Sequence, residues 1–167
     1  IHGHYAVEDG TGAAVNAFSA VAAVAEDERA GLVLDAGDTF HGDSFATVNQ
    51  GTAIAALMDA AGYDATTPGN HDWSYGSDRL AEIDADVSFS VLAANVSDRE
   101  TGDALFKDAY RLIEVPLEGA SGGLTGQSVT VGVFGVIDDG SYGSTAPGNV
   151  SRVESSDAVD VANETAG

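Results

Sequence analysis

The sequence predicts an α/β fold, and three features of its first hundred residues lead to that prediction. Short apolar segments bounded by glycine or proline occur at 31–36, 63–67 and 89–93. Segments with helical spacing of apolar residues lie between and before them, at 11–29, 52–61 and 77–85. Polar, glycine-containing loops follow two of the apolar segments. This alternation is typical of parallel strands joined by right-handed helical crossovers.

The first expected helix begins at Thr11, whose hydroxyl is a suitable N-cap, and ends before Gly31. One face of that helix carries its apolar residues, which are Ala14, Phe18, Val21, Ala22 and Ala25. The segment 31–36 is short and mostly apolar, as expected of a strand buried on both faces. We expect a loop from Gly37 to Asn49 to follow that strand.

The second helix, over 52–61, is closed by Gly62 and directs its apolar residues inward, at Ile54, Leu57 and Met58. A short strand over 63–67 ends at Pro68-Gly69. The third helix, over 77–85, is more polar, and the strand 89–93 ends at Asn95. These elements complete the expected parallel sheet.

The remaining part of the chain predicts a different arrangement. Two strand-like segments, 110–117 and 128–137, are joined by a stretch rich in glycine and serine, which favours an antiparallel hairpin. Residues 138–149 form an expected turn-rich loop, and a helix is expected within 155–165.

Composition limits the classes of partner. The chain has 167 residues, which suits a single domain. It carries 27 acidic and 6 basic side chains, a net charge of −21 that repels nucleic-acid polymers and anionic membranes. The chain has no cysteine, which excludes disulfides and thiolate ligands. Its longest apolar stretch, near 15–25, is too short for insertion into a membrane.

Three loops carry side chains that are suited to metal binding. Gly37-Asp38 and Gly69-Asn70-His71-Asp72 follow two expected strands, and Ile1-His2-Gly3-His4 opens the chain. Ligands gather at the carboxyl ends of parallel strands in open α/β sheets. Aspartate, asparagine and histidine are suitable ligands for divalent ions such as Mn²⁺, Zn²⁺ or Fe²⁺. A pair of such ions can activate water and hold a phosphoryl group.

These motifs resemble the N-terminal part of the catalytic domain of bacterial 5′-nucleotidases, in the calcineurin-like metallophosphoesterase superfamily. The resemblance is carried by residues 2–4, 36–44, 51–59, 62–72, 93–95, 131–136 and 147–150. It implies a partial α/β/β/α sandwich with mixed sheets. Residues 1–167 would be the N-terminal portion of the catalytic domain, without its second half or a C-terminal nucleotide-binding domain. A secreted, periplasmic or cell-surface location is also implied.

The resemblance also implies a role for each site residue and two divalent ions, which could be Mn, Zn, Fe, Co or Mg. His2 would bind the first ion, Asp38 would bridge both, and Asn70 would bind the second. His71 would be the catalytic histidine, stabilising the transition state or protonating the leaving oxygen. Asp72 is a second catalytic candidate that could orient His71, and Asp43 and Ser74 remain alternatives for that support.

Three departures from the family pattern affect this expectation. One is Ser74, which stands where the family commonly has a carboxylate three residues after the catalytic histidine. The aspartate expected two residues before His2 would fall outside the chain, and no histidine follows His71. Ions are therefore expected to be absent or weakly bound in this chain, and the chain itself is expected to be inactive. An unpaired sheet edge would also favour self-association.

The implied function is hydrolysis of nucleoside 5′-monophosphates, small-molecule substrates, by the protein from which the chain comes. Two alternatives keep the chemistry and change the substrate: a 2′,3′-cyclic nucleotide phosphodiesterase and a UDP-sugar hydrolase. An alternative of another class is a non-catalytic acidic binding module that has lost its metals.

Overall fold

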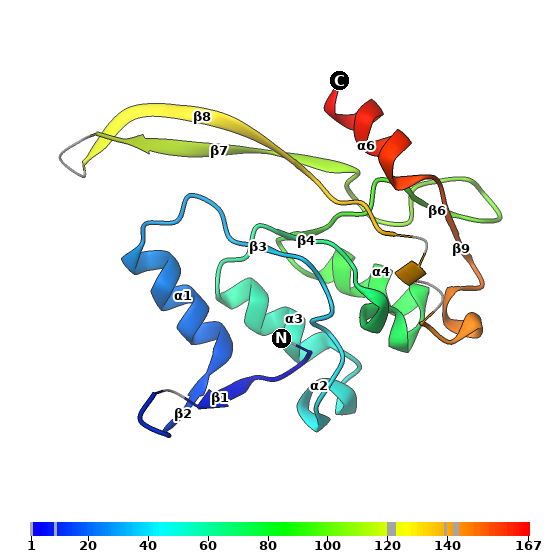
Figure 1. Ribbon diagram of the computed structural model, residues 1–167, viewed down its shortest axis with the longest axis horizontal. Coiled ribbons are helices and arrows are strands. Elements are labelled where there is room, and N and C mark those ends of the chain that lie inside the picture. The colour runs from blue at the N-terminus through cyan, green and yellow to red at the C-terminus, as the bar shows by residue number, and fades with distance from the viewer. Residues whose placement is uncertain (1, 9, 120–122, 139, 142–143) are drawn as a thin grey trace.

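The computed structural model describes residues 2–8, 10–119, 123–138, 140–141 and 144–167. Its strands are β1 (Ala6–Glu8), β2 (Ala14–Asn16), β3 (Leu34–Asp35), β4 (Ala65–Thr66), β5 (Ser90–Val91), β6 (Val96–Asp98), β7 (Tyr110–Glu118), β8 (Leu124–Phe134) and β9 (Val153–Ser155). Its α-helices are α1 (Ala17–Asp27), α2 (Ser44–Val48), α3 (Thr52–Ala60), α4 (Ser77–Asp86) and α6 (Ala158–Ala166). Two 3₁₀-helices, η1 (Asn70–Tyr75) and η2 (Pro147–Val150), complete the described elements (Figure 1).

The predicted parallel sheet is present. Strands β3, β4 and β5 pair in parallel in that order, with Leu34 opposite Ala65 and Ala65 opposite Ser90. Antiparallel pairs accompany it, so the chain has the mixed sheets and α/β class expected from the sequence. The expectation that the first strand is buried on both faces is wrong at Leu34, which is 49% exposed. Leu34 lines two open pockets beside β3, so the described residues cover its side chain only in part.

The first helix begins later than predicted. Residues 14–16 form β2, which pairs antiparallel with β1, and the helix starts at Ala17. Its N-cap is Asn16, whose side-chain oxygen accepts hydrogen bonds from the backbone N–H groups of Phe18 and Ser19, both at 3.0 Å. The pairing of β2 with β1 therefore displaces Thr11 from the cap position. A further correction is the short helix α2, which occupies part of the expected loop 37–49.

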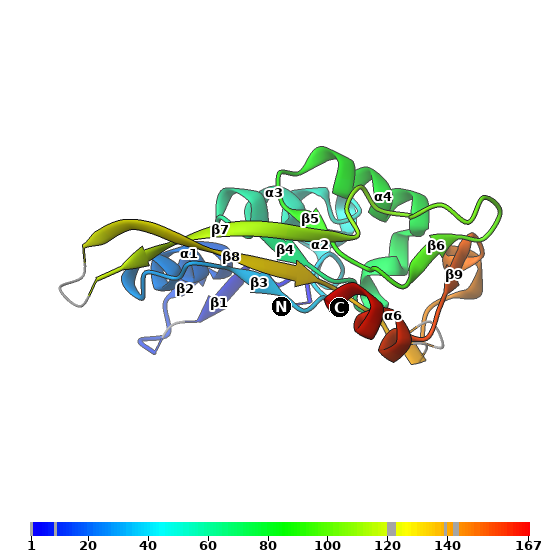
Figure 2. The same cartoon turned by 90° about the horizontal axis from the view of Figure 1, so that it is seen from above.

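The long β7–β8 hairpin has the antiparallel pairing that the sequence predicts. It passes along the side of the sheet opposite α1 and α3, as Figures 1 and 2 show. Its contacts with the body of the molecule include a 3.1 Å ion pair between Arg29 and Glu118. Arg111 also donates a 3.0 Å hydrogen bond to the carbonyl of Asp64. The described part of the chain leaves most of β8 exposed.

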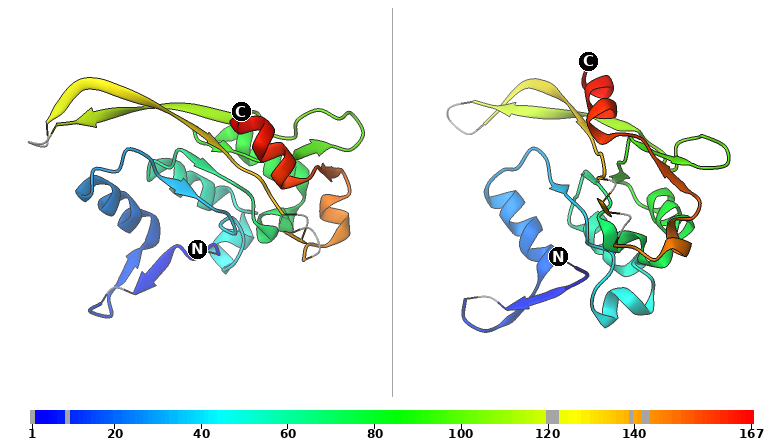
Figure 3. Two further views of the ribbon diagram at one scale, coloured as in Figure 1. Left: turned by 45° about the horizontal axis from the view of Figure 1, so that its top comes forward. Right: turned by 45° about the vertical axis from the view of Figure 1, so that its right-hand side comes forward.

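The hydrophobic core lies between the helices and the parallel sheet. It is built around side chains that are almost completely buried, including Phe18, Phe40, Ile54, Met58, Trp73, Leu80, Phe89 and Val91. Asn95 ties the C-terminal segment to this core, because its side chain accepts from the N–H of Ile137 and donates to the carbonyls of Ile137 and Ser156. Helix α6 follows and lies beside the hairpin (Figure 3). Within the described residues, none of the helices combines the length and apolar composition needed to cross a membrane.

Candidate metal centre

Two loops meet at the carboxyl ends of β3 and β4. The first contains Gly37 and Asp38, and the second runs from Pro68 into the 3₁₀-helix η1. Parallel neighbouring strands bring these loops to the same edge of the sheet, as the sequence predicts. The 3₁₀-helix η1 was not predicted, and it contains both His71 and Asp72.

The two loops approach so closely that side chains are excluded at two glycines. A Cβ atom at Gly37 would clash with the backbone of Gly69 and Thr67, and one at Gly69 would clash with the Asp38 carboxylate. Gly37 also has a φ of +93°, in the region that favours glycine. These glycines therefore allow the backbone contact that brings Asp38 next to the histidine loop.

The buried carboxylate of Asp72 holds the two loops together. It accepts hydrogen bonds from the backbone N–H groups of Asp38, Thr39, Phe40 and Gly69, at 2.7 to 2.9 Å. Its side chain is almost inaccessible, at 2% exposed. Burial raises the pKa of the Asp72 carboxyl, and the four N–H donors oppose that rise. These bonds make Asp72 part of the framework of the two loops, and its expected support of His71 stays a prediction.

Asp38 lies at the centre of the site. Its Oδ1 accepts a 2.9 Å hydrogen bond from the backbone N–H of His71, and its Oδ2 lies 3.8 Å from Nε2 of His2. Its φ of +58° is uncommon for a residue with a side chain. Because Asp72 and Gly69 fix the surrounding backbone, this conformation directs the carboxylate toward both histidines.

The start of the chain lies along the Asp38 loop. The N–H groups of His2 and Gly3 donate to the carbonyls of Asp38 and Thr39, both at 2.9 Å. A Cβ at Gly42 would clash with the backbone of His2, so the two segments are in direct contact. This docking places the His2 side chain beside the Asp38 carboxylate.

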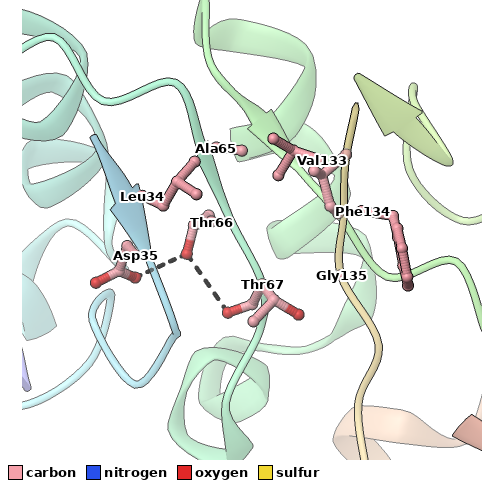
Figure 4. Close-up of a pocket in the computed structure, with 9 residues that line it drawn as sticks. Leu34, Asp35, Ala65, Thr66, Thr67, Val133, Phe134 and Gly135 are labelled. Carbon is pink, nitrogen blue, oxygen red and sulfur yellow. Dashed lines mark hydrogen bonds between the residues drawn. The ribbon is translucent and has the colours of Figure 1, made fainter. Parts of the chain in front are cut away.

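A second carboxylate, that of Asp35, hydrogen-bonds to the loop that contains Asp38. It accepts hydrogen bonds from the N–H of Gly37 at 3.0 Å and from the hydroxyls of Thr39 and Thr66. Figure 4 shows Asp35 on β3 joined to Thr66 on β4, beside a pocket of about 100 Å³. Asp35 was not among the predicted site residues, although an aspartate within an apolar strand indicates a specific polar partner.

Segment 145–150 holds η1 from the other side. The Thr145 hydroxyl donates a 2.8 Å hydrogen bond to the carbonyl of Asn70, and the Asn149 amide donates one of 2.8 Å to the carbonyl of Ser74. Asn70 is half-buried at the start of η1, next to His71. The resemblance selected 147–150 without giving it a role, and these contacts supply one.

Two histidine rings, those of His2 and His41, lie against the ring of His71. The His2 and His71 ring centroids are 5.1 Å apart, and His41 stacks on His71 at 5.3 Å with an interplanar angle of 2°. The alternative supports for His71 have other contacts: Asp43 caps α2 and lies 3.7 Å from His4, and the Ser74 carbonyl accepts from Asn149. The stacking of His41 on His71 was not predicted, because the position of His41 depends on the course of the loop after Gly37.

The donor set fits a divalent cation. One ligand atom each from His2, Asp38 and His71 lies within 4.8 Å of the other two. Imidazole nitrogen and carboxylate oxygen together suit Zn²⁺, Mn²⁺ and Fe²⁺. Three protein ligands leave open positions for water or substrate. The described residues thus bring together His2 and Asp38, as expected, and add His71 to the same cluster.

Comparison of the sequence with those of known proteins finds similarity to 5′-nucleotidases. No protein-family model matches the chain. It is 35% identical over 89 residues to the 5′-nucleotidase of Rattus norvegicus, covering 53% of this chain and 16% of that protein. It is 43% identical over 72 residues to a probable 5′-nucleotidase of Treponema pallidum (strain Nichols), covering 43% of this chain and 12% of that protein. The matches thus span a small part of these relatives' length.

Comparison of structures extends the similarity along the whole chain. The crystal structure of the calcineurin-like phosphoesterase YfkN from Bacillus subtilis matches with a TM-score of 0.75 and 25% identity. That match covers 98% of this chain and 54% of the YfkN chain. The chain is therefore similar in sequence to 5′-nucleotidases over about half of its length, and it has the fold of the calcineurin-like phosphoesterase YfkN.

Proposed function

We propose that the protein from which this chain comes is a metal-dependent phosphoester hydrolase acting on nucleoside 5′-monophosphates. The observation that carries this proposal is the convergence of His2, Asp38 and His71 at the carboxyl ends of parallel strands. The 5′-nucleotidase relatives support the choice of substrate. We further propose that residues 1–167 are an N-terminal portion of the catalytic domain and contain only part of its site.

In this proposal His2, Asp38 and Asn70 hold divalent ions, which supply Lewis-acid polarisation of the phosphoryl group when bound. Asp38 is suited to a bridging position because its carboxylate is fixed by the His71 N–H and faces His2. His71 is the catalytic residue, placed to stabilise charge on a phosphoryl oxygen or to protonate the leaving oxygen. Asp72 is a positioning residue, since its hydrogen bonds set the distance between the loops.

The cluster is too small for tight binding of two ions by this chain alone. His2 is exposed, at 53% of its side chain, so an ion there is also accessible to water. With His71 kept for catalysis, His2, Asp38 and Asn70 are too few ligands to hold two divalent ions tightly. We therefore propose that the isolated chain has no phosphohydrolase activity of its own.

Two alternatives of substrate remain within the proposal, a 2′,3′-cyclic nucleotide phosphodiesterase and a UDP-sugar hydrolase on the same domain. The non-catalytic module is less well supported, because the loop glycines and the Asp72 bonds preserve a ligand geometry.

A secreted, periplasmic or cell-surface location is part of the proposal and rests on the family resemblance. A small-molecule substrate suits an acidic chain, since nucleic-acid polymers are repelled.

The test uses the full-length protein and this chain side by side. With Mn²⁺ or Zn²⁺, we expect the full-length protein to release phosphate from AMP faster than it opens 2′,3′-cyclic AMP or cleaves UDP-glucose. His71→Asn should reduce kcat by at least a hundredfold, whereas His4→Asn, in the same region, should retain activity. A full-length protein that binds no divalent ion and hydrolyses none of these substrates would establish the non-catalytic module. Metal-dependent turnover by the isolated chain would overturn the proposal that it is inactive.

A further inference from the structure

The half-buried side chain of His41 contacts two other aromatic rings beside the candidate metal centre. Its ring is parallel to that of His71, with centroids 5.3 Å apart and an interplanar angle of 2°. It also contacts the ring of Tyr75, at a centroid distance of 5.5 Å and an angle of 52°. His71 and Tyr75 belong to the same 3₁₀-helix, η1, so His41 contacts that helix at two points. Parallel rings at this separation attract one another beyond simple apolar contact.

The backbone on each side of His41 is fixed by contacts of its own. The N–H of Phe40 donates a 2.8 Å hydrogen bond to the carboxylate of Asp72, which is part of η1. On the other side, a Cβ at Gly42 would clash with the carbonyl group of His2. The stack therefore joins two segments whose backbones are already held against one another.

The geometry of the stack suits a role in orienting the His71 ring. Contact between ring faces opposes rotation about the Cβ–Cγ bond, a torsion that is otherwise broad. The ring nitrogens lie at the edge, outside the stacked faces. One His71 nitrogen lies within 4.8 Å of ligand atoms of His2 and Asp38. Within the residues that the structure describes, that cluster does not include His41.

We propose that His41 is a positioning residue that holds the plane of the His71 imidazole, so that a nitrogen of the catalytic ring faces the phosphoryl group. This inference rests on the proposed phosphohydrolase function. The nearby carboxylates accept hydrogen bonds elsewhere: Asp72 from four backbone N–H groups, and Asp43 from N–H groups at the start of α2. Among the described residues, the ring contacts of His71 are those with His2 and His41.

Two variants of the full-length protein form a matched pair. His41→Phe and His41→Leu both remove the ring nitrogens, and only His41→Phe retains a flat ring. We expect His41→Phe to keep kcat for AMP within about twofold of the wild type. His41→Leu should lower kcat roughly tenfold with KM unchanged, because a misplaced catalytic group weakens binding of the transition state alone. His4→Leu, at an exposed position of the neighbouring segment, is the control and should leave kcat unchanged.

The amount of bound metal separates positioning from metal binding. Because His41 lies outside the cluster of ligand atoms, both variants should bind as much Zn²⁺ as the wild type. Inductively coupled plasma mass spectrometry measures this content. Loss of metal in His41→Phe would place His41 among the ligands and overturn the proposal.

The order of the His71 ring gives a measurement that does not depend on turnover. NMR relaxation of ¹³C-labelled histidine rings in the full-length protein reports their picosecond-to-nanosecond motion, and Zn²⁺ is a suitable diamagnetic ion. His71→Asn identifies the His71 signal. We expect the order parameter of that ring to fall in His41→Leu and to stay at the wild-type value in His41→Phe. If His41→Leu fails to fold, His41→Met, which also lacks a flat ring, replaces it in each comparison.

The outcomes separate this proposal from the proposed function. Equal kcat values or equal order parameters in the two His41 variants would overturn the positioning role. A wild-type protein without turnover would contradict the proposed function, whereas a lower order parameter in His41→Leu than in His41→Phe would still support the orienting effect of the stack.

Discussion

The backbone N–H of His71 donates a 2.9 Å hydrogen bond to Oδ1 of Asp38, which joins the loop after β4 directly to the loop after β3. The two residues lie 33 positions apart in the sequence. Because the donor is a backbone group, the bond fixes the Asp38 carboxylate and leaves the His71 imidazole free to act. Changes that separate the two loops should therefore affect metal binding before they affect the rest of the fold.

Asp72→Asn should destabilise the chain by about 2–4 kcal/mol. Four backbone N–H groups donate to the Asp72 carboxylate, and in the variant at least two of them would face the amide NH₂, which cannot accept a hydrogen bond. Urea unfolding followed by circular dichroism measures this change. Asp103→Asn, at an exposed position, is the control and should alter stability by less than about 0.5 kcal/mol. Equal stability of the two variants would refute the framework role of Asp72.

Gly69→Ala should separate the loops, because the added Cβ would clash with the Asp38 carboxylate. We expect a loss of stability of about 1–3 kcal/mol from overpacking, and at least tenfold weaker Mn²⁺ or Zn²⁺ binding in the full-length protein. Isothermal titration calorimetry and urea unfolding measure the two effects. Gly148→Ala is the matched control, since an added Cβ there meets no described atom within 4 Å. Unchanged metal affinity in Gly69→Ala would show that the close approach is unnecessary.

Thr145→Val should release η1 with little change in side-chain volume. The variant loses the 2.8 Å hydrogen bond to the Asn70 carbonyl, at a cost of about 1 kcal/mol. We expect severalfold weaker metal binding in the full-length protein, because the 3₁₀-helix carries Asn70 and His71. Thr165→Val removes a comparable bond within α6 and should leave metal affinity unchanged. If both variants bind metal equally well, segment 145–150 has no part in holding the site.

The β6–β9 region should loosen in acid. Hydrogen bonds from the Glu100 backbone and from Arg152 lower the pKa of Asp98 below its ordinary value. A lowered pKa contributes stability at pH values above the unfolded pKa, and this contribution is lost as pH falls through the folded pKa. The protection factors of residues 96–98 and 153–155, which are exchange rates corrected for the pH dependence of intrinsic exchange, should therefore fall below about pH 4. In Asp98→Asn, that fall should be smaller.

The order of elements and the positions of the polar loops could be predicted from the sequence. Apolar segments ending at Gly37 and Pro68 are local features, and they predicted parallel strands with ligands at one edge. The long hairpin was predictable for the same reason, since its strands and its glycine-rich turn are adjacent in the chain. The similarity to 5′-nucleotidases was also visible in short motifs.

Other features depended on contacts between distant segments. The pairing of β1 with β2 moved the start of the first helix from Thr11 to Ala17. The stacking of His41 on His71 follows from the course of the loop after Gly37, which local spacing does not specify.

The sequence by itself determined the parallel α/β sheet, the hairpin and the polar loops at the ends of two strands, because helical and strand periodicity and glycine punctuation are local signals. Only the tertiary structure decided which partners the side chains of those loops contact. Asp72 is adjacent to His71 in sequence, yet its carboxylate bonds the backbone of residues 38–40 and 69. The physical reason is that a buried carboxylate must find hydrogen-bond donors, and the nearest donors belong to the loop of a neighbouring strand.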